Sequence, residues 1–170
     1  IVSGERKAPF VQAVCFGRIQ DLGISDQNNM GAAMAPAAAS TIKTFLEDTG
    51  TKPEDYELIL TGDLGKVGSD LLEQLLQKDG IDIMERHQDC GLLLYDREKQ
   101  QVESGASGCG CAASVASCHL FPHMEKGEGP KSALVIATGA LLSPTSIQQG
   151  ETIPGVAHLV CFTAEERRLF

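Results

Sequence analysis

A glycine-rich turn combines residue types that could bind an anion. Residues 105–114 contain three glycines and otherwise small side chains, and a helical pattern follows directly. Glycine lets the backbone adopt positive φ and lets a ligand approach closely, and the first amides of a helix lack partners. The helix dipole adds positive potential, so a carboxylate, thioester oxygen or phosphate would be stabilised there. The alternative is that these small residues only allow a helix to pack closely on a sheet.

A second glycine-rich turn, residues 62–68, superficially resembles a phosphate-binding loop. That motif would place its first glycine at Leu60 and its hydroxyl residue at Val67, so the match fails. Gly108, Gly110 and Ala113 fit a loose dinucleotide fingerprint, but no strong strand leads into them, which makes a dinucleotide site the weaker alternative. Both turns leave the carboxyl ends of strands or open helices, where open α/β sheets keep their ligand sites.

Cysteine and histidine residues offer a metal-binding alternative. Cys109, Cys111, His119 and His123 could form a Cys2His2 set, with the histidines one helical turn apart. Pro122 disturbs that turn, and the Cys-x-Cys spacing is tight for structural zinc. A partly exposed helix face explains both histidines better, so we expect no resident metal.

The sequence gives little support for a catalytic cysteine or for disulfide bonds. A thiolate needs a nearby base, and the sequence offers only His87 near Cys90 and His158 near Cys161. Neighbours on a strand point to alternating faces, so this adjacency proves little. The six cysteines are irregularly spaced and no export signal is present, so we expect reduced thiols.

Composition excludes several function classes. The net charge of −9 and the absence of a basic stripe argue against nucleic acid as a partner. With 42% hydrophobic and 22% charged residues, the 170-residue chain should form one globular domain with a sizeable core. No run is long enough to span a bilayer, so we expect a soluble chain that could still attach to a membrane complex through a partner.

Apolar periodicity predicts alternating strands and helices. We expect a helix that ends at Gly50, with its regular part at 36–48 and a separate approach or kink before Pro36. Ser69 should cap a second helix, and a charged turn at 96–99 should join a hairpin. The remaining helix is expected at 111–126, the hairpin strands at 90–95 and 101–104, and further strands at 11–19, 56–61, 132–138 and 155–162. This order predicts an α/β layered sheet with helices packed against it.

The first residues contain no sign of a starting element. Residues 1–9 have neither a helix cap nor a strand pattern. We therefore expect the chain to be part of a larger polypeptide.

Several segments together resemble one protein family over nearly the whole chain. They are Asp21-Leu22-Gly23-Ile24, Asn29-Met30-Gly31-Ala32-Ala33-Met34-Ala35-Pro36-Ala37-Ala38-Ala39, Leu58-Ile59-Leu60-Thr61-Gly62-Asp63-Leu64, Asp89-Cys90-Gly91-Leu92, Ser107-Gly108-Cys109-Gly110-Cys111, Val135-Ile136-Ala137-Thr138-Gly139-Ala140-Leu141-Leu142-Ser143-Pro144 and Gln148-Gln149-Gly150-Glu151-Thr152-Ile153-Pro154. These segments resemble the stage V sporulation protein AD family of spore-forming bacteria. The resemblance concerns the carboxyl half of that family, so residues 1–170 would form one half-domain and the amino half would be absent.

The resemblance implies a thiolase-like fold and allows its catalytic positions to be tested. The whole fold has two similar halves in five layers, and this chain would supply one αβα half with a mixed five-stranded sheet flanked by helices. Compared with β-ketoacyl synthase III type enzymes, the active-site His position is Gly62 and the active-site Asn position is Cys109. The nucleophilic Cys would belong to the absent half. The expectation is therefore a protein with no catalytic residue and no cofactor.

Binding is the function that the resemblance implies instead. The family takes part in moving dipicolinic acid, free or as its calcium chelate, into the developing spore with a membrane channel complex. We expect the chain in the cytoplasm or forespore, peripheral at the spore inner membrane, and paired as a homodimer through the thiolase-like core. The predicted ligand-binding residues are Gly62, Asp63, Lys66, Gly108, Cys109 and Gly110.

Two other functions stay open. An acyltransferase or condensing enzyme acting on acyl-coenzyme A thioesters is the main alternative, although the residues at 62 and 109 weigh against it. The third is an oligomerisation module, since a lone half should expose an apolar surface that its sister half would cover.

Overall fold

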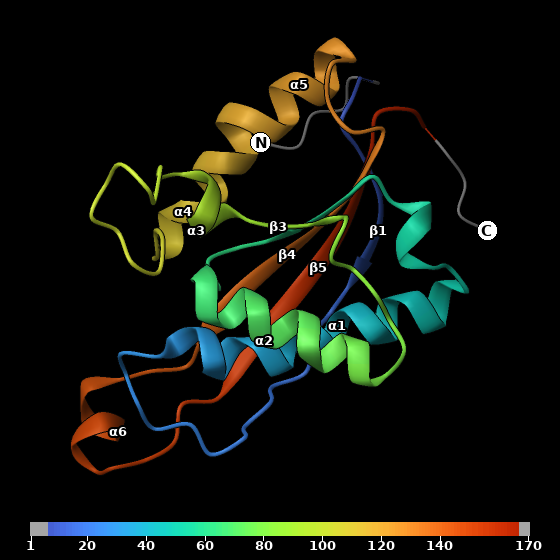
Figure 1. The fold of residues 1–170 in the computed structure, drawn as a ribbon. Coiled ribbons are helices and arrows are strands. Elements are labelled where there is room, and N and C mark those ends of the chain that lie inside the picture. The colour runs from blue at the N-terminus through green and yellow to red at the C-terminus, as the bar shows by residue number, and fades with distance from the viewer. Residues whose placement is uncertain (1–6, 167–170) are drawn as a thin grey trace.

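A five-stranded mixed sheet forms the centre of the protein (Figure 1). The computed structural model describes residues 7–166, so part of the expectation about residues 1–9 lies outside the described residues. The strands are β1 (Phe10–Cys15), β2 (Leu58–Thr61), β3 (His87–Asp89), β4 (Ser132–Ala140) and β5 (Gly155–Thr163), in the spatial order β1-β5-β4-β2-β3. β2 pairs in parallel with β3 and β4, and β5 is antiparallel to β4 and β1. The predicted α/β class and mixed sheet are confirmed.

Helix α1 (Met30–Thr49) begins earlier than the sequence predicts. The expected break before Pro36 is wrong, because the helix runs continuously through that proline. Asn29 caps its start by accepting a hydrogen bond from the Ala32 amide, 3.4 Å away. Gly50 ends the helix in the left-handed conformation at φ 64°, as predicted.

Helix α2 (Gly65–Lys78) also begins before its expected cap. Ser69 lies inside the helix, is buried, and its hydroxyl makes no hydrogen bond among the described residues. The Leu64 and Gly65 amides at the helix start are satisfied by the distant Asp89 carboxylate. A cap from another part of the chain therefore replaces the local one.

The predicted hairpin around residues 96–99 does not form. β3 pairs with β2, and the chain then turns into a short helix, α3 (Cys90–Leu93). The Asp89 side chain caps α3 by accepting from the Gly91 amide at 3.0 Å. Residues 94–108 form an irregular loop, and its Ser104 carbonyl accepts from the Lys66 amide.

The third helical region is continuous but not uniform. It comprises α4 (Cys109–Val115), a π-helical turn η2 (Ala116–Leu120) and α5 (Phe121–Lys126). Two shorter segments complete the structure, a 3-10 turn η1 (Pro53–Asp55) and α6 (Pro144–Gln148). Each lies in a connection outside the sheet.

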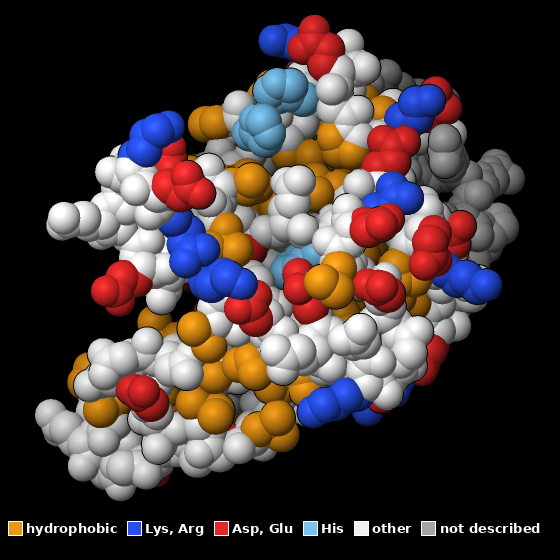
Figure 2. All heavy atoms as spheres, viewed as in Figure 1, with side chains coloured by type: hydrophobic (Ala, Val, Ile, Leu, Met, Phe, Trp, Pro, Cys, Tyr) orange, Lys and Arg blue, Asp and Glu red, His pale blue; other side chains and the backbone are white. Residues whose placement is uncertain are grey.

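Helices cover the two faces of the sheet with two separate apolar clusters. Alternation along the strands explains this, since Ile59 contributes to the cluster under α1 and α2 while Leu58 and Leu60 contribute to the cluster under α4 and α5. Figure 1 shows α1 and α2 side by side on one face. Figure 2 shows apolar side chains reaching the surface between charged ones. None of the described helices is both long and apolar enough to cross a bilayer.

Candidate functional site

The structure brings the two glycine-rich turns together through Asp63. One oxygen of its carboxylate accepts from the Gly108 amide at 2.9 Å and from the Ser107 hydroxyl at 3.3 Å. The other oxygen accepts from the Thr138 hydroxyl of β4 at 2.9 Å. Because Asp63 follows β2, it joins the ends of two strands to the start of α4. The anion expected at the Gly108 amide is therefore supplied by the chain itself.

Gly62 lies at a position that has no room for a side chain. A Cβ atom built on Gly62 would lie 2.6 Å from the Thr138 Oγ1 and 3.1 Å from the Thr138 amide nitrogen. Part of this barrier is backbone of the neighbouring strand, which cannot move away cheaply. A side chain at this position therefore requires the Thr138 hydroxyl to move and β4 to shift slightly.

The start of α4 is open to solvent. Gly108 adopts φ 106°, which favours glycine, and no side chain caps the helix at this residue. Cys109 and Gly110 follow it and are exposed, whereas Cys111 is buried against the sheet. Backbone amides in the first turn of a helix lack intrahelical partners. Because Asp63 already accepts from the Gly108 amide, the backbone amides of Cys109 and Gly110 are the ones that can contact a ligand.

Lys66 does not point its charge at these amides. Its ammonium pairs with Asp70 one helical turn further along α2, at 2.6 Å from the Oδ2 atom. Both side chains are about half exposed. Exposed pairs of this kind are weak, so the ammonium can leave Asp70 for another anion at little cost.

A cavity adjoins the site. It has a volume of about 420 Å³ and is bounded by the start of α1, the start of α2 and the loop 104–107. Of the six predicted ligand-binding residues, only Asp63 lines it. Amide, hydroxyl and thioether side chains make up half of the remaining lining, from Asn28, Asn29, Met30, Met34, Ser104 and Ser107.

Asp89 organises this region and was not predicted as a site residue. Its side chain is 1% exposed and accepts from the Thr61 hydroxyl at 2.7 Å, from the Leu64 and Gly65 amides at 2.9 and 3.0 Å, and from the Gly91 amide. These four donors come from three different elements and the turn between them. The sequence carried no signal for this role, because Asp89 directly precedes the expected hairpin strand at 90–95.

The polar network continues from Asp89 to the surface. The Thr61 hydroxyl also contacts the His87 Nε2 atom at 3.0 Å, and the His87 Nδ1 atom contacts Glu73 at 2.8 Å. The His87 side chain is almost completely buried, and it joins β3 to α2. Sequence placed this histidine near Cys90, but the structure gives it carboxylate and hydroxyl partners.

The buried cysteines are poorly suited to act as nucleophiles. Burial, with a smaller contribution from the Asp89 carboxylate, raises the pKa of the Cys90 thiol to about 12. Burial also raises the pKa of Cys161 to about 11. Both thiols stay protonated at neutral pH. The cysteines within residues 7–166 are all free thiols, as predicted.

Comparison with known proteins identifies the family. A family profile described as "Stage V sporulation protein AD (SpoVAD)" matches residues 1–163. The chain belongs to this family. It is 49% identical over 152 residues to the stage V sporulation protein AD of Bacillus subtilis (strain 168). That match covers 89% of this chain and 44% of the relative, so the chain spans less than half of the relative's length.

One solved structure, with a TM-score above 0.5, supports the fold. MvaS in complex with 3-hydroxy-3-methylglutaryl coenzyme A matches 94% of this chain and 41% of that chain, with a TM-score of 0.55 and 12% identity. The 3-oxoacyl-[acyl-carrier-protein] synthase III of Aquifex aeolicus VF5 matches 94% of this chain and 55% of that chain, with a TM-score of 0.49 and 14% identity. The predicted thiolase-like fold is confirmed. At these identities the likeness concerns the fold alone.

Proposed function

We propose that this chain forms one wall of a dipicolinic acid site in a sporulation protein that catalyses no reaction. The observation that carries the proposal is the closed position at Gly62. The resemblance to condensing enzymes puts a catalytic imidazole there, but Thr138 of β4 crowds this position. Cys109 in place of the expected Asn removes a carboxamide that would stabilise an oxyanion.

The start of α4 supplies donors that suit a carboxylate. The uncapped turn at Cys109 and Gly110 combines backbone amides with the positive end of the helical region. Asp63 is already bonded to Gly108, and its charge opposes a free dianion. A calcium chelate of dipicolinate carries no net charge. It is therefore not repelled by the Asp63 carboxylate or by the net charge of −9 on the chain. Lys66 can turn from Asp70 to a ligand carboxylate.

A titration of the full-length protein with dipicolinate, with and without Ca²⁺, tests this function. Cys109→Leu should weaken binding at least tenfold, because the larger side chain covers the start of α4. Cys118→Leu is the matched control, since Cys118 is exposed on the same helical region but lies outside the candidate site. Unchanged affinity in Cys109→Leu would remove this turn from the site. A wild-type protein that does not bind dipicolinate would overturn the function itself.

A second assay separates this proposal from the enzyme alternative. The full-length protein is incubated with acetyl- and malonyl-coenzyme A, and free coenzyme A is measured. We expect no release above the protein-free rate. Release that depends on the protein would support a thiolase-like acyltransferase instead.

We also propose two kinds of association. In the first part, the protein acts beside the spore inner membrane with the channel proteins of its sporulation stage. In the second part, it pairs as a homodimer through its thiolase-like core. Family membership supports the first part. Exposed apolar side chains on β1, such as Val14, and Phe16 directly after it support an association surface. Crosslinking in sporulating cells, followed by identification of the partners, tests both parts. Recovery of the protein alone from the soluble fraction would contradict them.

A further inference from the structure

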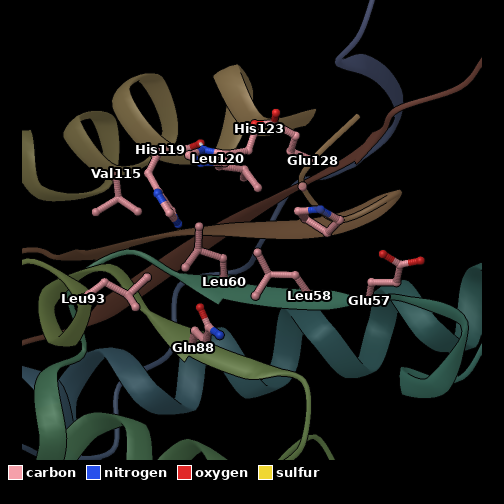
Figure 3. Close-up of a pocket in the computed structure, with 12 residues that line it drawn as sticks. Glu57, Leu58, Leu60, Gln88, Leu93, Val115, His119, Leu120, His123 and Glu128 are labelled. Atoms are coloured by element: carbon pink, nitrogen blue, oxygen red, sulfur yellow. Dashed lines mark hydrogen bonds between the residues drawn. The ribbon is translucent and has the colours of Figure 1, made fainter. Parts of the chain in front are cut away.

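Two histidines lie side by side on the helical region away from the Asp63 site. His119 belongs to the π-helical turn η2, and His123 follows four residues later in α5. Their ring centroids are 4.6 Å apart, with planes inclined at 54°. Figure 3 shows them on the helical wall of a cavity of about 350 Å³. Residues four apart share one face of a helix, so both imidazoles are available to the same ligand.

The hydrogen bonding of His123 prepares it to bind a metal ion. Its Nδ1 atom lies 2.6 Å from the His119 carbonyl oxygen. A carbonyl oxygen can only accept, so Nδ1 carries the hydrogen and the Nε2 lone pair is free. Metal-bound histidines typically donate their other N–H to a carbonyl or carboxylate, which fixes the tautomer and ring orientation. Among the described residues the His119 ring makes no hydrogen bond, so its nitrogens are also available.

The surroundings favour a cation. Glu57 and Glu128 line the same cavity, and its described lining contains neither lysine nor arginine. One Glu57 oxygen accepts from the Lys131 amide at 2.8 Å, which anchors this side chain at the cavity edge. Figure 3 shows Glu57 and Glu128 at one end of the cavity and Leu93 and Val115 at the other.

We propose that His119 and His123 form a two-imidazole chelate for a divalent transition metal ion such as Zn²⁺ or Cu²⁺. Imidazole nitrogen suits these ions, whereas Ca²⁺ and Mg²⁺ prefer oxygen. Within residues 7–166 no three His, Cys, Asp or Glu side chains are grouped to hold a metal, so water or a small ligand in the cavity completes the coordination. Turns of π-helix are frequent at functional sites, and here the turn contributes one of the two ligands. The site is independent of dipicolinate binding.

Calorimetric titration of the full-length protein with Zn²⁺ alone tests the chelate. Cys109→Ser/Cys118→Ser serves as the background, because these exposed thiols could bind Zn²⁺ themselves. His119→Gln and His123→Gln should each weaken the site at least tenfold. His158→Gln is the matched control and should leave affinity and stoichiometry unchanged, since it alters an exposed histidine on β5. Equal affinity in all variants would overturn the proposal.

A spectroscopic measurement on the unsubstituted histidine pair does not depend on how the histidine variants fold. In the same background, the electron paramagnetic resonance spectrum of one equivalent of Cu²⁺ should show hyperfine coupling to two imidazole nitrogens. His119→Gln should reduce this to one. A spectrum without two coupled nitrogens in the protein that retains both histidines would contradict the chelate.

Discussion

The Asp63 carboxylate lies 2.9 Å from the Gly108 amide, although 45 positions separate the two residues. This bond joins the end of β2 to the start of α4, and it occupies the amide that the sequence suggests for an external anion. A ligand at this site must therefore use the next amides, at Cys109 and Gly110, or displace Asp63. The contact also places the closed Gly62 position beside the open start of α4.

Replacing Asp89 by Asn should destabilise the protein by about 3 kcal/mol. The buried carboxylate accepts four hydrogen bonds, and an amide group would place donors against the Leu64, Gly65 or Gly91 amides. Urea unfolding at pH 7 measures the change. Asp70→Asn, which removes only an exposed ion pair with Lys66, should stay within about 0.5 kcal/mol. Equal unfolding midpoints for wild type and Asp89→Asn would show that the carboxylate is dispensable.

Gly62→Ala should cost about 1–3 kcal/mol, because the added methyl group meets the Thr138 hydroxyl and backbone. Gly110→Ala is the matched control. Its Cβ would have no heavy atom within 4 Å, and alanine favours a helix, so stability should be equal or higher by up to about 1 kcal/mol. Thermal unfolding compares the two variants. A neutral Gly62→Ala would mean that β4 can yield, which would reopen this position to a larger side chain.

Stability should fall as pH rises above about 9. The pKa of the Cys90 thiol is about 12 in the folded protein, against 9.0 for an unperturbed thiol, so the unfolded chain loses this proton first. Stabilisation from the protonated thiol is thus complete below pH 9 and is lost towards pH 12. At pH 10 the loss is about 1.4 kcal/mol for such a thiol. Urea unfolding at pH 8 and pH 10 should therefore show a smaller decline for Cys90→Ala than for wild type, and identical declines would contradict this assignment.

The isolated 170-residue chain should self-associate. Val14 on β1 is 54% exposed and Phe16, directly after β1, is 84% exposed. β1 is an edge strand that pairs only with β5 among the described residues, so its outer edge presents apolar surface and backbone hydrogen-bonding groups. Sedimentation velocity should show species larger than a monomer, with a smaller fraction for Val14→Lys. Met84→Lys alters an equally exposed side chain in the loop before β3 and should leave the distribution unchanged. A stable wild-type monomer at all concentrations would rule out this association surface.

The local sequence pattern was sufficient to predict the strands and helices whose apolar residues form the core. The runs around Ile59, Leu134 and Leu159 predict strands because β-branched and leucine side chains there fill both faces of a covered sheet. Gly50 predicts a helix end because its left-handed conformation is costly for other residues. The hairpin prediction failed because residues 90–104 lack the apolar alternation of paired strands, and the chain satisfies its backbone with Asp89 and a loop instead.

The sequence by itself determined the α/β class, most of the strands, the two glycine-rich turns and the absence of His at residue 62 and Asn at residue 109. These features depend on residue type and on the spacing of residues that are close in the sequence. The tertiary structure alone decided that Asp63 occupies the Gly108 amide, that Asp89 caps α2 in place of Ser69, and that β4 closes the space at Gly62. Each of these contacts joins residues that lie close only after β2, β3 and β4 are paired, and hydrogen-bond donors then donate to whichever oxygen the fold brings within reach.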